Sequence, residues 1–318
     1  MKRFLICLAA LLPFVSGYAQ DFSVIARAEY STAEDGHLGN SSIYFVADGN
    51  FTENFSYSTE LHLLSAYPAD LYTSFFTPGC MNFLDWFDLT YDFGPVQLSA
   101  GKEILTVGTF ENLEYDFDVN YESASSLWFG DTESCLTAFP SVYQWGARLD
   151  FPFLDVFNIS AQVTSSPFAE RTFKNGYCSY NMQFTANTES EEDQYWAGVA
   201  AVNFAQRGER DFFKLASAGL KFHTGSWSFI LDHFNEFASS YRGGDALSVV
   251  YEPTDNIGMT VKGGYESGMF FEADNRTYAS FTFNWYPIEQ LRVHAIAAYD
   301  SLYDNPLFNI GVTWTISL

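Results

Sequence analysis

The chain is built of stretches of about ten residues in which apolar and polar side chains alternate, with turn residues between one stretch and the next. Residues 309–318, NIGVTWTISL, are such a stretch. Every second residue from Ile310 to Leu318 is apolar, and those between are Gly, Thr or Ser. A period of two is the pattern of a β-strand with one apolar face. Repeated along the chain, it predicts an all-β fold.

The polar faces of these stretches carry full charges, and the apolar faces have aromatic residues near their ends, such as Phe93, Trp145 and Trp285. Other clear stretches lie at 55–63, 86–93, 143–151, 257–266, 279–285 and 291–300. Aromatic girdles around an apolar band mark a transmembrane β-barrel, and a tilted strand crosses with about 9–11 residues. Because lipid satisfies no backbone polar group, such strands must close on themselves. The pattern predicts an antiparallel transmembrane β-barrel.

The connections between the stretches are asymmetric, as expected of short periplasmic turns and longer outer loops. Short turns at 94–95, 224–225, 254–256 and 287–289 alternate with polar segments at 67–82, 109–140, 167–176, 238–245 and 267–276. The count is about sixteen strands. The pattern is weakest in three of them, at 177–187, 195–205 and 213–222, and fourteen strands is the alternative. The last strand is expected to close the barrel against the first, around 24–30.

The first 19 residues have the features of a cleaved export signal. Lys2 and Arg3 precede an apolar run from Phe4 to Val15 that is too short to span a bilayer comfortably. Small residues flank Tyr18, and cleavage after Ala19 would leave residues 20–318 as one barrel domain. No later run of about 18 apolar residues predicts a transmembrane helix.

Composition excludes two other classes. Aromatic residues are 19% of the chain and charged residues only 17%, whereas about 25% charged is usual. This aromatic content does not fit disorder. Without the signal, 13 basic side chains face 39 acidic ones, a net charge of −26. Nucleic-acid binding needs a basic patch, so we exclude it.

Three cysteines remain after the signal: Cys80, Cys135 and Cys178. An odd number is not a disulfide framework. A single bridge, such as one from Cys80 to Cys135, and free thiols both fit the sequence.

Residues 96–117, VQLSAGKEILTVGTFENLEYDF, resemble a segment of the sixteen-stranded porin families of Gram-negative outer membranes. These include phosphate-selective-porin-like proteins and uncharacterised porin-type barrels of Bacteroidota. The shared features are Gly101-Lys102-Glu103, a second glycine at Gly108, and Glu111-Asn112 opening a long loop. Phosphate selectivity implies a ladder of lumenal Lys and Arg, which 13 basic residues do not supply. We therefore do not transfer that selectivity.

The resemblance also implies partners. The strand Asn309–Leu318 resembles the sorting signal read by the barrel assembly machinery, with Leu318 in place of the usual Phe. The surroundings would be outer-membrane lipid, the cargo small hydrophilic solutes, and the assembly a homotrimer. No cofactor is expected.

Lys102 breaks the alternation. If Leu98 and Ala100 face lipid, strict alternation turns Lys102 toward lipid near mid-height, where a lysine costs about 2–4 kcal/mol. A bulge at Gly101 would turn Lys102 inward and Glu103 outward. Either residue then lines the constriction, or Lys102 lies at a subunit interface or at the rim.

In porins one long loop folds inward and narrows the channel. By that resemblance the acidic start of 109–140 would form an eyelet that favours cations or neutral sugars; a solvated outer loop is the alternative. The constriction candidates are Lys102, Glu103, Glu111, Asn112, Glu114, Asp116 and Asp118. Asp116-x-Asp118-x-Asn120 opens like a calcium loop, but Tyr121 replaces the required Gly and Leu127 the final Glu. No metal site is expected.

Strand alternation assigns a second set of charges to the lumen, and both signs occur, so some are expected to pair across the wall. This set is Arg27, Glu29, Glu60, His62, Asp88, Asp92, Arg148, Asp150, Lys262, Glu266, Arg292, His294 and Asp300.

Three function classes compete. The first is a passive, weakly cation-preferring diffusion porin. The second is a structural, adhesive or specialised-ligand barrel with a largely blocked lumen, favoured if bulky side chains such as Trp86, Ile230 and Phe234 fill the interior. The third, an enzyme, needs a Ser/His or Asp/His pair at one rim. Asp232 and His233 are neighbours on a strand and point to opposite faces, so we expect no enzyme.

Overall fold

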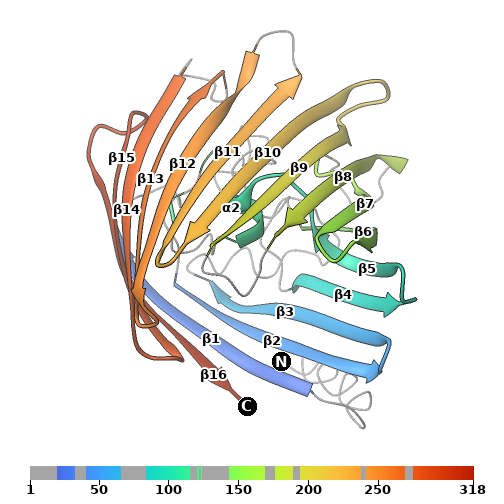
Figure 1. The fold of residues 1–318 in the computed structure, drawn as a ribbon, viewed down its shortest axis with the longest axis horizontal. Coiled ribbons are helices and arrows are strands. Elements are labelled where there is room, and N and C mark those ends of the chain that lie inside the picture. The colour runs from blue at the N-terminus through green and yellow to red at the C-terminus, as the bar shows by residue number, and fades with distance from the viewer. Residues whose placement is uncertain are drawn as a thin grey trace.

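The computed structural model is a closed barrel of sixteen antiparallel strands (Figure 1). It describes residues 20–32, 41–65, 84–114, 120–121, 123, 143–168, 176–188, 194–237, 241–268 and 275–318. The strands are β1 (Gln20–Ser31), β2 (Ser42–Thr52), β3 (Phe55–Ser65), β4 (Leu84–Asp92), β5 (Gln97–Ile104), β6 (Tyr143–Phe153), β7 (Phe157–Ser165), β8 (Cys178–Asn187), β9 (Gln194–Gln206), β10 (Phe212–Thr224), β11 (Trp227–Phe237), β12 (Tyr241–Thr254), β13 (Ile257–Ser267), β14 (Asn275–Ile288), β15 (Leu291–Asp300) and β16 (Leu307–Ser317). A short helix, α2 (Phe110–Glu114), lies inside the ring of strands.

The last strand closes the barrel against the first, as the sequence predicts. Val24 on β1 lies opposite Ile316 on β16, and Tyr30 lies opposite Ile310. The backbone N–H of Leu318 donates to the carbonyl of Phe22 at 2.8 Å. Neither strand is therefore left as an open edge.

The three strands with the weakest pattern are present as β8, β9 and β10, each within two residues of its predicted bounds. Sixteen strands, rather than fourteen, is correct. The predicted outer segment 238–245 is wrong in extent, because β12 already begins at Tyr241, paired with Phe237. Gly243, Gly244 and Asp245 hid this alternation in the sequence.

Short turns join the strands at one end of the barrel, which is also the end where β1 starts and β16 finishes. The turn after β4 has Gly94 at φ +92°, a conformation that glycine adopts without strain. The turns after β10, β12 and β14 lie at this end too. The opposite end carries the longer connections, so the predicted asymmetry is confirmed. Among the described residues, no helix has the length and apolarity needed to span a membrane.

The outer face of the wall is apolar and has aromatic residues toward both ends. Exposed aromatics near the short-turn end are Phe93, Phe151, Phe153, Trp196, Trp227, Trp285 and Trp314, and those near the other end are Tyr30, Tyr180, Phe204, Phe237, Tyr241, Tyr265, Tyr299 and Phe308. Between them lie exposed aliphatic residues such as Val202, Leu231 and Val261. A closed sheet with such a surface has its stable place in a bilayer, and in Gram-negative bacteria that bilayer is the outer membrane.

One polar pair interrupts this outer face. His233 on β11 and Asp245 on β12 are directly opposite each other, and His233 Nδ1 lies 2.9 Å from Asp245 Oδ1. Their side chains are 47% and 61% exposed. His233 is four residues, or about 13 Å of strand, from the aromatic Phe237. Asp245 lies directly opposite Tyr265 of the aromatic girdle, so the pair lies at the edge of the apolar band nearer the longer connections.

Two glycines lie opposite each other where β5 pairs with β6. Gly101 on β5 lies opposite Gly146 on β6, and each faces backbone rather than side chain. A Cβ on Gly101 would lie 1.8 Å from the carbonyl oxygen of Phe87, and one on Gly146 would lie 2.2 Å from that of Val163. Only glycine permits this close approach.

Candidate functional site

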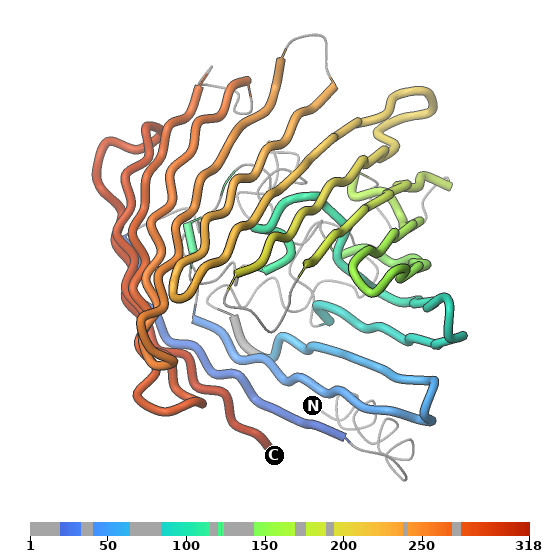
Figure 2. The backbone as a smooth tube through the Cα atoms, viewed as in Figure 1, coloured from blue at the N-terminus to red at the C-terminus, as the bar shows by residue number. Residues whose placement is uncertain are grey.

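The chain leaves the wall after β5 and continues inside the barrel. Figure 2 shows this segment, in teal and green, running from β5 into the space enclosed by the strands. Leu105 and Val107 pack against Phe213, Leu215 and Phe234 of the inner wall. We call residues 105–114, with Tyr121 and Ser123, the inward segment.

Side-chain amides of β7, β8 and β9 replace the hydrogen-bond ladder that the inward segment lacks. Gln162 Nε2 donates to the carbonyl of Ile104 at 2.9 Å, and Gln162 Oε1 accepts from the N–H of Thr106 at 3.2 Å. Asn203 Nδ2 donates to the carbonyl of Thr106 at 2.6 Å, and Gln183 Nε2 to that of Val107 at 2.8 Å. Buried backbone polar groups need such partners.

Gly108 and Asp232 fix the inward segment against β9, β10 and β11. The Gly108 N–H donates to Ser217 Oγ at 2.7 Å. A Cβ on Gly108 would lie 2.3 Å from the Ala201 nitrogen, so no larger residue fits. The Asp232 carboxylate accepts the N–H groups of Phe110 at 2.8 Å and Glu111 at 3.1 Å. It therefore caps the first turn of α2, where N–H groups have no partner within the helix.

Glu111 is held in a buried ion pair rather than facing solvent. Lys262 Nζ lies 2.7 Å from Glu111 Oε1, and both side chains are 2% exposed. The N–H of Ser123 also donates to Glu111 Oε1 at 2.7 Å, and the Ser123 hydroxyl bonds Oε2. Burial raises the pKa of Glu111, but the Lys262 charge and the bonds from Lys262 and Ser123 outweigh it and hold that pKa below its ordinary value.

Tyr121 fastens the far end of the inward segment to β13, β14 and β15. Its hydroxyl donates to Asp300, which also accepts from Arg276 Nε at 2.7 Å. Arg276 pairs in turn with Glu266 at 3.1 Å and lies over the Tyr121 ring. Burial raises the pKa of Tyr121; Arg276 opposes this shift, and Asp300 adds to it. Lys262 donates to the Tyr121 carbonyl at 2.9 Å.

The remaining eyelet candidates lie on or beyond α2. Glu114 pairs with Lys221 of β10 at 2.7 Å, and Asn112 Nδ2 donates to Thr109 Oγ1 at 2.5 Å. Asp116 and Asp118 lie outside the described residues. In the described part, the eyelet carboxylates Glu111 and Glu114 thus each pair with a lysine of the wall.

Lys102 and Glu103 are both buried, at 4% and 5% exposure. Neither arrangement considered from the sequence is found: the β5 ladder passes through Gly101 without a register shift, yet Lys102 is not exposed to lipid. The reason is that β5 pairs with β4 only as far as Lys102, although it stays paired with β6 as far as Ile104 and turns inward after that. The Lys102 ammonium reaches the carbonyl of Leu84, which begins β4.

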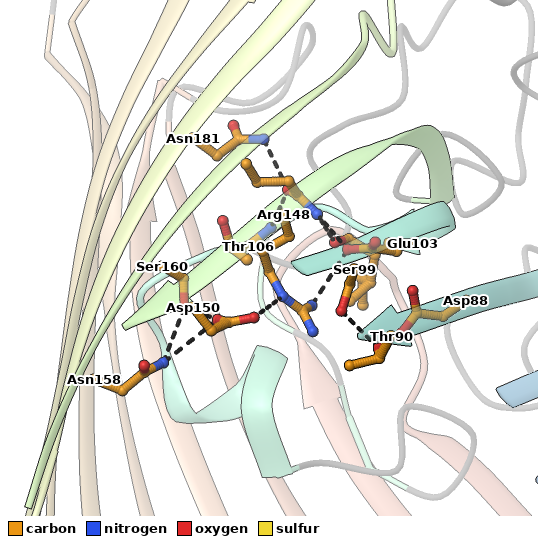
Figure 3. A network of polar contacts seen from close by, with 12 residues as sticks. Asp88, Thr90, Ser99, Glu103, Thr106, Arg148, Asp150, Asn158, Ser160 and Asn181 are labelled. Carbon is orange, nitrogen blue, oxygen red and sulfur yellow. Dashed lines mark hydrogen bonds and ion pairs between the residues drawn. The ribbon is translucent and has the colours of Figure 1, made fainter. Parts of the chain in front are cut away.

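Figure 3 shows the polar network on the lumen side of β4–β8. Arg148 lies between two carboxylates, with Nη1 3.4 Å from Glu103 Oε2 and Nε 2.8 Å from Asp150 Oδ2. Asp88 accepts the hydroxyl of Thr90 at 2.8 Å.

The other charges assigned to the lumen lie at several separate places on the wall. Arg27 and His294 each lie 3.5 Å from Glu29 Oε1, so these three form one cluster on β1 and β15. His62 Nδ1 lies 3.5 Å from Asp85 and its ring stacks on Tyr44. Glu60 is half-buried, Arg292 donates to Thr313 at 3.4 Å, and Asp92 accepts the N–H of Gly94 at 2.6 Å, which makes Asp92 part of a turn.

Sequence reasoning missed several interior charges. Arg276 and Arg242 fell inside segments read as outer loops, although both lie on strands, and Arg242 pairs with Glu236 at 2.9 Å. Asp232 lies between Ile230 and Phe234 on the inner face of β11. Because both of these neighbours are apolar, the sequence did not mark that face as lumenal and polar. The alternation of 227–237 was the available signal, because Asp232 shares the phase of Ile230.

The inward segment divides the lumen. Inward side chains of β7–β11, such as Gln162, Asn203 and Asp232, are buried beneath it. Inward side chains of β2–β4, such as Ser58 and Glu60, are only half-buried. Among the described residues, the solvent-accessible part of the lumen therefore follows β2–β4 and β6. No group of three or more His, Cys, Asp or Glu suited to a metal is found there, and Cys178 is a free thiol.

No protein family and no curated protein matches this sequence. The fold, by contrast, is similar to solved structures of outer-membrane proteins. A loop-deletion mutant of OmpT from Vibrio cholerae superposes with a TM-score of 0.62 at 12% identity, covering 94% of this chain and 99% of that one. The trimer form of OmpT gives 0.58 at 12% identity, with 95% and 100% covered. Pseudomonas aeruginosa OccK2 in complex with glucuronate gives 0.51 at 9% identity, with the same coverage. At these identities the likeness concerns the fold.

Removing the Lys262 ammonium should release the inward segment. Lys262→Met leaves the Glu111 carboxylate buried without its cation, which costs about 3–5 kcal/mol. We expect faster amide hydrogen exchange in 105–114 while the barrel stays folded. Lys214→Met, which removes an exposed lysine of β10, is the matched control and should change nothing. Unchanged exchange in Lys262→Met would contradict the role of this pair.

The ion pair should also resist acid. A carboxyl whose pKa is lower in the folded state stabilises the fold above its unfolded pKa and loses that contribution as the pH falls through the folded value. Protection factors in 105–114 should therefore persist below the ordinary glutamate range and decrease only at more acidic pH. Glu111→Gln should remove the part of this dependence that comes from the Glu111 carboxylate, leaving the part that comes from Asp232, which accepts the N–H groups of Phe110 and Glu111. An unchanged pH profile in Glu111→Gln would contradict the role of the ion pair.

Proposed function

We propose that this protein is an outer-membrane channel through which small hydrophilic solutes diffuse passively. The observation that carries the proposal is the fixation of the inward segment to the wall from β7 to β15. Fixed there, it narrows the barrel and leaves the polar inner faces of β2–β4 and β6 accessible. Constriction of the pore by protein side chains is how such channels select solutes.

A weak preference for cations is part of the proposal. The net charge of −26 without the signal, and the half-buried Glu60 and Asp88 on the accessible wall, support it. The lumen also holds Arg27 and Arg148, so the preference is expected to be modest. Glu111 is a structural ion-pair partner in this scheme rather than the selectivity filter.

We also propose that the barrel is not an enzyme. Asp232 is engaged at the start of α2, while His233 faces outward and bonds Asp245. Asp232 and His233, which are neighbours in the sequence, thus lie on opposite faces of the wall. A barrel with a blocked lumen is the competing candidate, and the buried Ile230 and Phe234 favour it locally.

Two finer assignments stay predictions. The resemblance to phosphate-selective-porin-like barrels of Bacteroidota rests on Gly101-Lys102-Glu103 and Glu111-Asn112. Recognition by the barrel assembly machinery rests on Asn309–Leu318. Both are consistent with the fold, and neither adds to the argument for a channel.

We further propose that copies of this chain pack together on the β10–β12 side, as a homotrimer. Acyl chains offer no hydrogen-bond partners, so the polar pair His233–Asp245 is costly against lipid. The neighbouring outward residues Ala216, Ala218 and Gly243 are small, which lets another barrel approach closely. A protein surface of matching height in the same membrane would satisfy the pair, and a second copy supplies one.

Cysteine labelling tests the channel. In a chain whose own cysteines are replaced by serine, Ser58→Cys on β3 places a thiol on the accessible wall, and Val261→Cys places one on the lipid face. In a planar bilayer we expect stable current steps with a cation-selective reversal potential. A bulky charged thiol reagent should reduce the conductance of Ser58→Cys severalfold and leave Val261→Cys unchanged. A folded, heat-modifiable barrel without conductance would overturn the channel in favour of a blocked barrel.

A bulky residue on the proposed contact face should separate the copies. Ala218→Trp adds an indole beside His233, which lipid accommodates and a packed interface does not. We expect the wild type to be trimeric by light scattering in mild detergent and Ala218→Trp to be monomeric. Ala28→Trp, on the outer face of β1, is the matched control and should remain trimeric. A monomeric wild type, or a trimeric Ala218→Trp, would contradict this interface.

A further inference from the structure

A cavity of about 210 Å³ opens from the lumen where β4, β5 and β6 meet. Trp86 and Tyr143 form one part of its lining, and Asp88, Glu103, Lys102 and Arg148 form another. It lies on the accessible side of the lumen, beside the point at which the inward segment begins. A solute passing along β2–β4 would meet it.

The two cations of this cavity are already engaged. Arg148 is shared between Glu103 and Asp150, at 3.4 and 2.8 Å. The Lys102 ammonium bonds the carbonyl of Leu84. Neither cation is therefore placed to hold an anionic solute without losing a partner in the wall.

Two carboxylate oxygens of the cavity receive no donor from the described residues, and their carboxyl groups lie within hydrogen-bond reach of each other. The two oxygens are Glu103 Oε1 and Asp88 Oδ1, and both atoms are buried. The second oxygen of each group is occupied, that of Glu103 by Arg148 and Gln162 and that of Asp88 by Thr90. Buried acceptors without donors are costly. A group that brings several N–H donors to this point would satisfy both.

The aromatic part of the lining suits a positive charge. The Trp86 and Tyr143 rings are 6.3 Å apart and tilted by 37°. Trp86 Nε1 donates to Ser58 Oγ at 3.1 Å, which fixes the indole. Aromatic faces attract cations, and they also cover alkyl carbons. The lining thus combines two acceptors with two aromatic rings.

We propose that this cavity is a subsite for the primary ammonium group of a small organic cation that passes through the channel. The N–H groups would donate to Glu103 Oε1 and Asp88 Oδ1, with the alkyl part against Trp86 and Tyr143. The inference rests on the proposed channel function for its biological sense, since it names the class of solute that the channel would favour. The binding itself does not require conduction.

The test is titration calorimetry of n-butylammonium into the refolded protein in detergent, at constant ionic strength. We expect saturable binding by the wild type and at least a tenfold weaker affinity in Asp88→Asn and in Glu103→Gln. The Thr90 hydroxyl donates to Asp88 Oδ2, and an asparagine oxygen can accept the same bond, so Asp88→Asn should fold normally. Asp21→Asn, which removes an exposed carboxylate at the start of β1, is the matched control and should bind like the wild type.

Three results would overturn the subsite. They are the absence of binding by the wild type, equal affinity in Asp88→Asn, and equally strong binding of glucose, which would indicate a neutral hydroxyl site. Conductance is measured separately on the same preparation. Binding without conductance would uphold the subsite and reject the channel, whereas conductance without binding would do the reverse.

Discussion

Every backbone polar group of a barrel in lipid needs a partner within the protein, and the rest of this structure depends on that requirement. In the wall, sixteen paired strands and the β1–β16 closure satisfy it. The difficult point is Ile104, where the chain leaves the sheet and loses its ladder. Gln162, Gln183 and Asn203 supply the missing partners there. The amide row on β7–β9 is thus what allows a segment to cross the lumen without strand pairing.

Charged side chains of the wall also hold the inward segment along its length. Asp232 caps α2, Lys262 neutralises Glu111, and Arg276 with Asp300 receives Tyr121. These groups come from β11, β13, β14 and β15, so the segment is fixed at several separate strands. A buried pair is weak evidence for stability in itself, but the loss of either partner is costly. The position of the segment is therefore defined by contacts from several separate strands.

The sequence predicts the wall well, because alternation is a local property. The period of two places Val261 outside and Lys262 inside without any knowledge of neighbouring strands. It fails where the outcome depends on residues far along the chain. The partnership of Glu111 with Lys262 spans 151 residues, and the burial of Lys102 depends on where β5 stops pairing with β4. Asp232 was missed because its neighbours in phase are apolar, and the acidic residues Asp116 and Asp118 lie outside the described chain.

The division of the lumen also explains why one cavity is left with unsatisfied acceptors. On the covered side, each interior cation of β10–β14 named above meets an acidic group, as Lys221 meets Glu114 and Lys262 meets Glu111. Where β4, β5 and β6 meet, the β4–β5 ladder ends early, and the Lys102 ammonium donates to the Leu84 carbonyl instead of to a carboxylate. Arg148 forms ion pairs with both Glu103 and Asp150. One oxygen of Glu103 and one of Asp88 then have no donor, and both are buried in the lining of the cavity beside β4–β6. The early end of the β4–β5 ladder, which frees the chain to turn inward, is thus also what creates the acceptor site beside it.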